Sequence, residues 1–322
     1  MTLEEKLEPF IERVVARHDR DGAVADSHLT RKGDLTGTDY FLARSVIRKQ
    51  GCMLDDCDDP DDGEWFSSPD GEWWVKGDTS NDEVTSHMFM MGHAYDLCAD
   101  EDQRRRIRAH VDGIAGHRSA QAIAILDLAY YMTAEQKYLD AEHELVDQHH
   151  YDENIVHESE YPFRAGSGDG DELVTQAFFV LLRYEQDPDL RALWLAGWRR
   201  TYSNTRLQQA AFWDMTNAVL GGDEPGFENA ARWLRLAPLD MIRWNQHNSQ
   251  RRDLAPSPEY YHDDGRMRSD GMILPYDERR CDRWNTDQFR VDGGMDGMRE
   301  MDGADVLEPY WMGRYYGFIV AE

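Results

Sequence analysis

The sequence predicts an all-α protein built from successive helical hairpins. Apolar residues recur with helical spacing along most of the 322 residues. Short polar joints such as "CADED", "GHRS" and "EQDPD" separate the periodic segments. Joints this short place consecutive helices antiparallel to each other, so the chain is expected to form α-hairpins. No boundary is apparent, and one domain is expected to span residues 1–322.

The first three helices are predicted from their apolar faces. The pattern over Glu83–Cys98 places Met88, Tyr95 and Cys98 on one side, so Cys98 is expected in the core. Gly116 is expected to terminate the third helix. The predicted helices are Leu3–His18, Glu83–Cys98, Asp100–Gly116, Ser119–Tyr131, Ala134–Gln148, Asp171–Glu185, Pro188–Tyr202, Leu207–Leu220, Asn229–Leu236 and Ala304–Phe318.

Two long segments, Gly51–Trp74 and Arg251–Gly303, break the helical pattern. Both are rich in Asp and Gly, and both contain Trp, Tyr or Phe. Their aromatic content is too high for disordered linkers, and long irregular segments inside a domain are commonly functional. We therefore expect them to border a binding or active site.

The charge of the chain indicates a high-salt environment. Acidic residues number 63 against 35 basic ones, a formal net charge of −28, and nearly all the positive charge is Arg. Such repulsion opposes a compact fold in dilute buffer, but at 1 M salt the screening length is only about 3 Å. We expect a soluble protein in the cytoplasm of a salt-accumulating halophile or in the virion of a virus that infects one.

Several function classes are excluded by what the sequence lacks. No basic stripe exists to bind the phosphates of nucleic acid. No long apolar run predicts a membrane span, and the N-terminal residues do not resemble a signal peptide. The four cysteines show no zinc-binding spacing. Neither nucleic acid nor membrane is an expected partner.

Two acid-rich helix starts resemble each other. "GDTSNDEV" and "GDGDELV" both place Gly-Asp and then Asp-Glu before an apolar helix. In a ring or incomplete toroid of hairpins, alternate helices run the same way, so these starts would meet at one end. Helix capping is the alternative explanation, and both stay open. At that end the ring would have a group of acidic residues, which we call the acidic mouth: Asp78, Asp82, Glu83, Asp169, Asp171 and Glu172.

Four ordered segments resemble a known family. They are "EWWVKGDTSNDEVTSHMFMMGHAYDLCADE", "DELVTQAFFVLLRYEQDPDLRALW", "RWNTDQFRVDGG" and "LEPYWMGRYYGFI". Together they resemble the uncharacterised "KGDTSSDE" family of α-helical toroid proteins, whose architecture is related to six-hairpin glycosidases and polysaccharide lyases. The resemblance implies an (α/α) toroid fold and activity on carbohydrate.

This chain also departs from the family pattern. A helical hairpin expected before the "ARS" element is missing, and "GSGDGDE" lacks a His of the second acidic helix start. Asp214 stands where an Asn usually follows the Trp. These departures weaken the inference of catalysis more than the inference of fold.

The candidate site residues follow from the chemistry of sugars. Glycoside hydrolysis needs two carboxyl groups, one of them protonated near neutral pH. Elimination from a uronic acid needs a base such as His. Each Trp has core packing as its alternative role. The predicted catalytic residues are Asp78, Asp82, Glu83, His87, Asp171 and Glu172, and the predicted substrate-binding residues are Trp74, Trp213, Trp244, Trp284, Asn285, Arg290 and Asp292.

Two functions remain open at this point. The first is a glycoside hydrolase or polysaccharide lyase acting on a surface or extracellular glycan at high salt. The second is a non-catalytic glycan-binding or structural component, in a homo-oligomer or a larger cell-surface or virion assembly. No cofactor or metal ligand is expected, apart from a structural cation at the acidic loops around Asp58 and Asp296.

Overall fold

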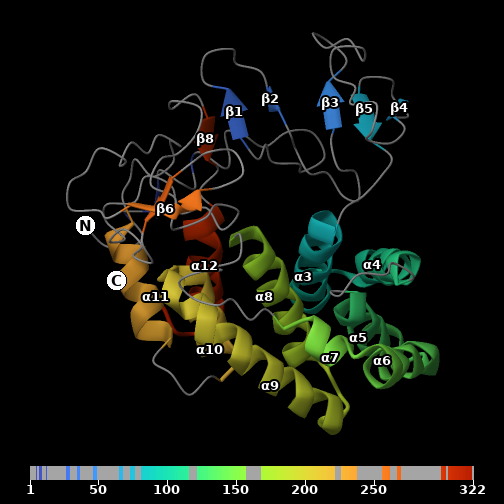
Figure 1. Cartoon of the computed structure of the whole chain (residues 1–322). Coiled ribbons are helices and arrows are strands. Elements are labelled where there is room, and N and C mark those ends of the chain that lie inside the picture. Colours follow the sequence, from blue (N-terminus) through green and yellow to red (C-terminus); the bar gives the residue numbers. More distant parts are fainter. Residues whose placement is uncertain are drawn as a thin grey trace.

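Helices form the body of the described chain (Figure 1), as the sequence predicts. The computed structural model describes residues 27–29, 35–36, 46–48, 65–67, 73–76, 81–115, 122–156, 168–221, 226–237, 256–261, 267–269, 299–301 and 304–320, together with Glu5, Leu7, Glu8 and Glu12. The helices are α3 (Asn81–Leu97), α4 (Glu101–Ile114), α5 (Ala122–Thr133), α6 (Gln136–His149), α7 (Tyr151–Asn154), α8 (Gly168–Tyr184), α9 (Pro188–Thr205), α10 (Ala211–Val219), α11 (Gly226–Leu236) and α12 (Ala304–Tyr315).

The helix starts show why these segments begin where they do. The Asp100 side chain accepts a bond from the Gln103 N–H at 2.9 Å, and the Gln103 side chain accepts one from the Asp100 N–H at 2.8 Å. This capping box satisfies two backbone donors at the start of α4. Asp187 caps α9 in the same position, followed by Pro188 at the first helical residue.

Three details differ from the sequence prediction. The segment predicted as Leu207–Leu220 is divided into a 3-10 turn, η2 (Arg206–Gln208), and α10, because Gln209 adopts a left-handed conformation with φ +54°. The short helix α7 was not predicted. Cys98 follows the last residue of α3 and is exposed, so its expected place in the core is wrong.

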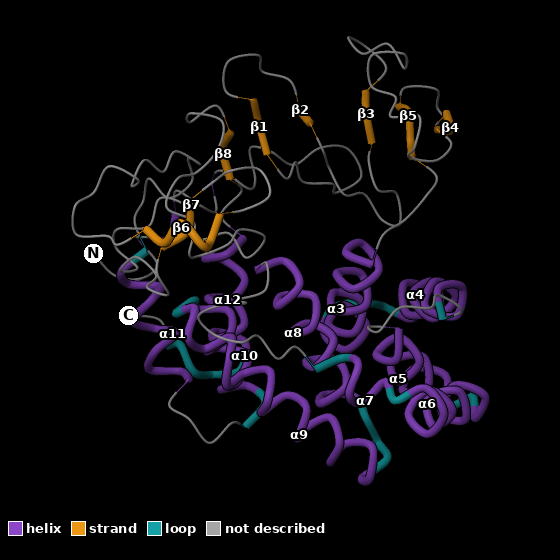
Figure 2. The backbone as a smooth tube through the Cα atoms, viewed as in Figure 1, coloured by secondary structure: helices purple, strands orange, loops and turns teal. Residues whose placement is uncertain are grey.

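Short strands occur in and next to the two segments expected to be irregular and also within residues 27–48, where no helix was predicted (Figure 2). They form three small antiparallel sheets: β1 lies between β2 and β8, β5 lies between β3 and β4, and β6 pairs with β7. The sequence analysis predicted none of them. The strands are β1 (Ser27–Leu29), β2 (Leu35–Thr36), β3 (Val46–Arg48), β4 (Trp65–Ser67), β5 (Trp73–Lys76), β6 (Pro256–Tyr261), β7 (Met267–Ser269) and β8 (Arg299–Met301).

Helix α8 is the centre of the helical core. Every residue from Asp171 to Leu182 is buried, as expected for a helix that other elements cover on all sides. It packs against α3, α5 and α9. The aromatic core beside it includes Trp194 and Trp198 of α9, both with no exposed surface. A polar residue on this part of α8 therefore lies inside the protein.

The helices of the described ranges include none that combines the length and the apolar character needed to cross a membrane. Helix α9, at 18 residues the longest in the part of the chain that the structure describes, carries Arg, Asp and Asn along its length.

Candidate functional site

Helices α3 and α8 lie side by side and run in the same direction (Figure 1). The ring of Phe89 contacts that of Phe179 at 5.1 Å between centroids, and further along both helices Asp96 meets Arg183 at 3.4 Å. The second contact lies nearer the C-terminus of both helices than the first, so the two helices are parallel. Their N-terminal turns, which carry the two acid-rich segments, lie at the same end of the pair.

The first acid-rich start is described only in part. Asp82, Glu83 and His87 belong to the first two turns of α3, but their side chains lie outside the described residues. Asp78 also lies outside them. The parallel packing brings the backbone of this helix start toward that of α8. The orientation of the Asp82, Glu83 and His87 side chains stays a prediction.

The second acid-rich start is buried. Asp171 is 1 % exposed and Glu172 2 % exposed. The side-chain amide of Gln208 donates to Asp171 Oδ2, and that of Gln176 donates to Glu172 Oε1 at 2.8 Å. Each carboxylate is thus bonded to a glutamine inside the protein, and a pure capping role does not account for these bonds.

Asp214 is a third buried carboxyl close to this end of α8. It lies in the first turn of α10, which begins three residues after Gln208. Its Oδ1 accepts a bond from the Tyr202 hydroxyl at 2.7 Å, and its Oδ2 accepts one from the Trp233 indole N–H at 2.7 Å. We call these two hydrogen-bonded groups, Asp171 with Gln208 and Asp214 with Tyr202 and Trp233, the polar cluster.

Burial controls the protonation of Asp214. Removal from water raises the pKa of this carboxyl from an ordinary 3.8 to about 6, although the bonds from Tyr202 and Trp233 favour the ionised form. Such a carboxyl is partly protonated in mildly acidic solution.

The raised pKa of Asp214 predicts a pH-dependent stability. A carboxyl with a higher pKa in the folded state stabilises the protein most below its unfolded pKa, and this contribution is lost as the pH rises through about 6. Between pH 4 and pH 7 wild type should lose roughly 2.4 kcal/mol relative to Asp214→Asn. Urea unfolding of both proteins at each pH measures the difference. The exposed Asp147→Asn controls for loss of a charge, and a constant difference for Asp214→Asn would contradict the prediction.

The predicted substrate-binding residues are only partly described. Trp213 has no exposed surface and packs edge-on against Phe212. It therefore has the alternative role considered for each Trp, packing in the core. Trp74 lies on β5, and its side chain lies outside the described residues. Trp244, Trp284, Asn285, Arg290 and Asp292 lie outside them as well, as do Asp58 and Asp296 of the acidic loops.

Sequence reasoning missed most of the polar cluster. Gln208, Tyr202 and Trp233 belong to no recognisable motif, because their contacts join different helices. Asp214 was noted only as a departure from the family pattern. The usable indication was its position: an Asp inside the strongly apolar "AAFWDM" is expected to be buried and therefore perturbed.

A cavity of about 400 Å³ opens elsewhere, between the second half of α3 and α4. Its lining is largely apolar and includes Met91, Cys98, Ile107 and His110. It lies toward the end of α3 opposite the acid-rich start, so it is distinct from the predicted mouth.

Comparisons with protein-family models, with curated proteins and with solved structures give no match.

Proposed function

We propose that this chain is a carbohydrate-active protein of the (α/α) toroid type, a glycoside hydrolase or polysaccharide lyase that acts on a surface or extracellular glycan at high salt. The observation that carries the proposal is the parallel packing of α3 and α8, which brings two acid-rich helix starts to one end. The resemblance of "KGDTSNDE" and three further segments to the toroid family supports the same function.

In this proposal one carboxyl group acts as the acid of hydrolysis and another as the nucleophile or base. Asp214, whose pKa is raised to about 6, is the group that donates a proton. A second carboxyl group of the acidic mouth, that of Asp82 or Asp171, acts as nucleophile or activates a water. In the elimination variant of the proposal, His87 removes the proton from the carbon beside the sugar's carboxylate, a C=C bond forms as the glycosidic C–O bond breaks, and Asp214 gives the departing oxygen a proton. An Arg such as Arg290 binds the carboxylate.

The test is an activity screen in roughly 2–4 M salt, where the screening length is about 3 Å or less. Neutral and uronic-acid polysaccharides are incubated with the full chain, and new reducing ends are measured beside ultraviolet-absorbing unsaturated products. The first product alone indicates hydrolysis, and both together indicate elimination. Asp82→Asn and Asp214→Asn should each lower the rate at least about 100-fold. The exposed Asp147→Asn should retain it, and equal rates in all variants would contradict the assigned residues.

One observation favours the non-catalytic alternative. Asp171 and Glu172 are buried and bonded to Gln208 and Gln176, an arrangement that also suits a structural role. In that case the protein would bind a glycan, or assemble into a cell-surface or virion particle, without turnover. Calorimetric binding of a glycan that yields no product, or light scattering that finds a multi-subunit particle, would support this second function over the first.

A further inference from the structure

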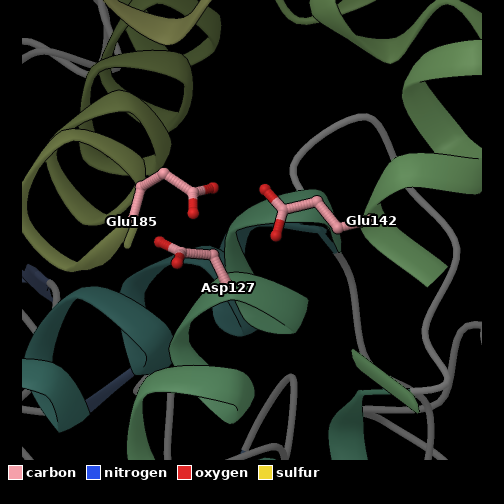
Figure 3. A group of neighbouring side chains, drawn as sticks. All are labelled: Asp127, Glu142 and Glu185. Atoms are coloured by element: carbon pink, nitrogen blue, oxygen red, sulfur yellow. The ribbon is translucent and has the colours of Figure 1, made fainter. Parts of the chain in front are cut away.

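Three carboxyl groups converge in the helical core away from the acidic mouth (Figure 3). Asp127 comes from α5, Glu142 from α6, and Glu185 from the residue directly after α8. One oxygen from each lies within 4.8 Å of the other two. The figure shows all three carboxyls directed toward a common point. We call these residues the carboxylate triad.

The triad is buried, and one of its members lacks hydrogen-bond partners among the described residues. Asp127 and Glu142 have no exposed surface, and Glu185 is 6 % exposed. Glu142 interacts with the Glu185 carboxyl and the Trp194 indole N–H, whereas neither carboxyl oxygen of Asp127 has a hydrogen-bond partner among the described residues. A buried polar group without a partner is costly, and a buried charge costs more. These oxygens therefore require a ligand or protons.

Glu185 is held in place by its neighbours. Its Oε1 accepts a bond from the Asp187 N–H at 2.7 Å, and its Oε2 accepts one from the Trp194 indole N–H at 3.3 Å. These bonds hold the Glu185 carboxyl where it faces Asp127 and Glu142. Burial, and then the charge of Glu185, raise the pKa of Asp127 well above its usual range. Burial followed by the charges of Asp127 and Glu185 does the same for Glu142.

No basic side chain of the described ranges forms an ion pair with the triad. His143 lies next to Glu142 on α6, but its Nε2 pairs with Asp187 at 3.4 Å. A bound cation would supply the missing positive charge.

We propose that Asp127, Glu142 and Glu185 bind one Ca²⁺ ion that joins α5, α6 and the turn between α8 and α9. Calcium–oxygen bonds measure about 2.3–2.6 Å, so oxygens within 4.8 Å of one another can contact one ion. Three carboxylates also offer up to six oxygens, enough to surround Ca²⁺ in a dry interior. Mg²⁺ fits less well because it usually keeps several water molecules. The proposal does not depend on activity toward carbohydrate.

The test measures thermal unfolding of the full chain in 2 M KCl, where association of cations with the acidic surface is strongly screened. Adding Ca²⁺ at about 100 times its Kd to protein treated with a chelator should raise the Tm of wild type by roughly 3–6 °C. Glu142→Gln and Asp127→Asn should lose this gain. In chelator their Tm should equal or exceed that of wild type, because each removes one of three like charges. The exposed Glu144→Gln, on the same helix, should behave as wild type does.

Terbium luminescence provides a second measurement, whose first part uses wild type alone. Tb³⁺ prefers the same oxygen ligands, and Trp194 lies beside Glu185, so excitation of tryptophan should produce Tb³⁺ emission in wild type. Ca²⁺ should displace the ion, and Glu142→Gln should weaken binding at least about tenfold. If wild type gives neither a Ca²⁺-dependent Tm nor displaceable emission, the triad shares protons instead and the proposal is wrong. Equal gains in wild type and Glu142→Gln would also overturn it.

Discussion

Replacing Trp198 with alanine should lower the free energy of unfolding by about 3–5 kcal/mol. The side chain has no exposed surface, and its indole stacks on Tyr202 at 5.6 Å between ring centroids. Its N–H donates to Asn217 Oδ1 at 3.1 Å, so truncation leaves a buried acceptor without this donor as well as a cavity. Guanidinium unfolding at molar salt measures the loss.

A second tryptophan provides the matched control. Trp311 on α12 is 54 % exposed, and Trp311→Ala should cost less than about 1 kcal/mol. Because the bond from Tyr202 lowers the pKa of Asp214, loosening Tyr202 in Trp198→Ala should raise that pKa further and strengthen the pH dependence attributed to the carboxyl. Equal losses for the two tryptophan variants would show that Trp198 is not an essential part of the core.

Replacing Gly226 with alanine should destabilise the protein by about 2–3 kcal/mol. A Cβ atom at this first residue of α11 would lie 2.3 Å from the backbone oxygen of Asp214 and 3.3 Å from the backbone nitrogen of Ala218. Backbone atoms cannot move aside as a flexible side chain can, so α11 must shift away from α10. The shift would also strain the bond from Trp233 to Asp214. Urea unfolding measures the effect.

Gly113→Ala separates this steric effect from the general effect of adding a methyl group to a helix. An added Cβ at Gly113 would meet nothing within 4 Å, and the residue lies inside α4. Alanine there should stabilise the protein by about 0.5–1 kcal/mol, because glycine is a poor helix former. A loss at both positions would contradict the assignment of the Gly226 effect to contact between α10 and α11.

Most helices could be predicted because each depends on local features of the sequence. Asp100 and Asp187-Pro188 mark the starts of α4 and α9, and apolar periodicity marks their lengths. The division before α10 could not be predicted, since the pattern continues through Gln209 and only its left-handed backbone breaks the helix. The short strands depend on pairing between distant segments, as in β1 with β8, which periodicity does not reveal.

The candidate sites depend on contacts between helices and were harder to predict. The shared end of α3 and α8 was expected from two similar segments, but the glutamine partners of Asp171 and Glu172 carried no pattern. Of the carboxylate triad only Asp127 was conspicuous, as the one charged residue in the apolar helix "AIAILDLAYYMT". Glu142 lies in the acidic segment "AEHELVD", where a buried carboxyl cannot be distinguished from exposed ones.

The pairing of α3 with α8 has a consequence for folding. Asp96 and Arg183 are separated by 87 positions, whereas α5 and α6 meet across a two-residue joint. Closing the larger loop costs more chain entropy than forming the local hairpin. The hairpin of α5 and α6 can therefore form early, whereas α3 can pack only after α5 and α8 have come together. The rate at which the chain reaches its native state should be limited by that late encounter.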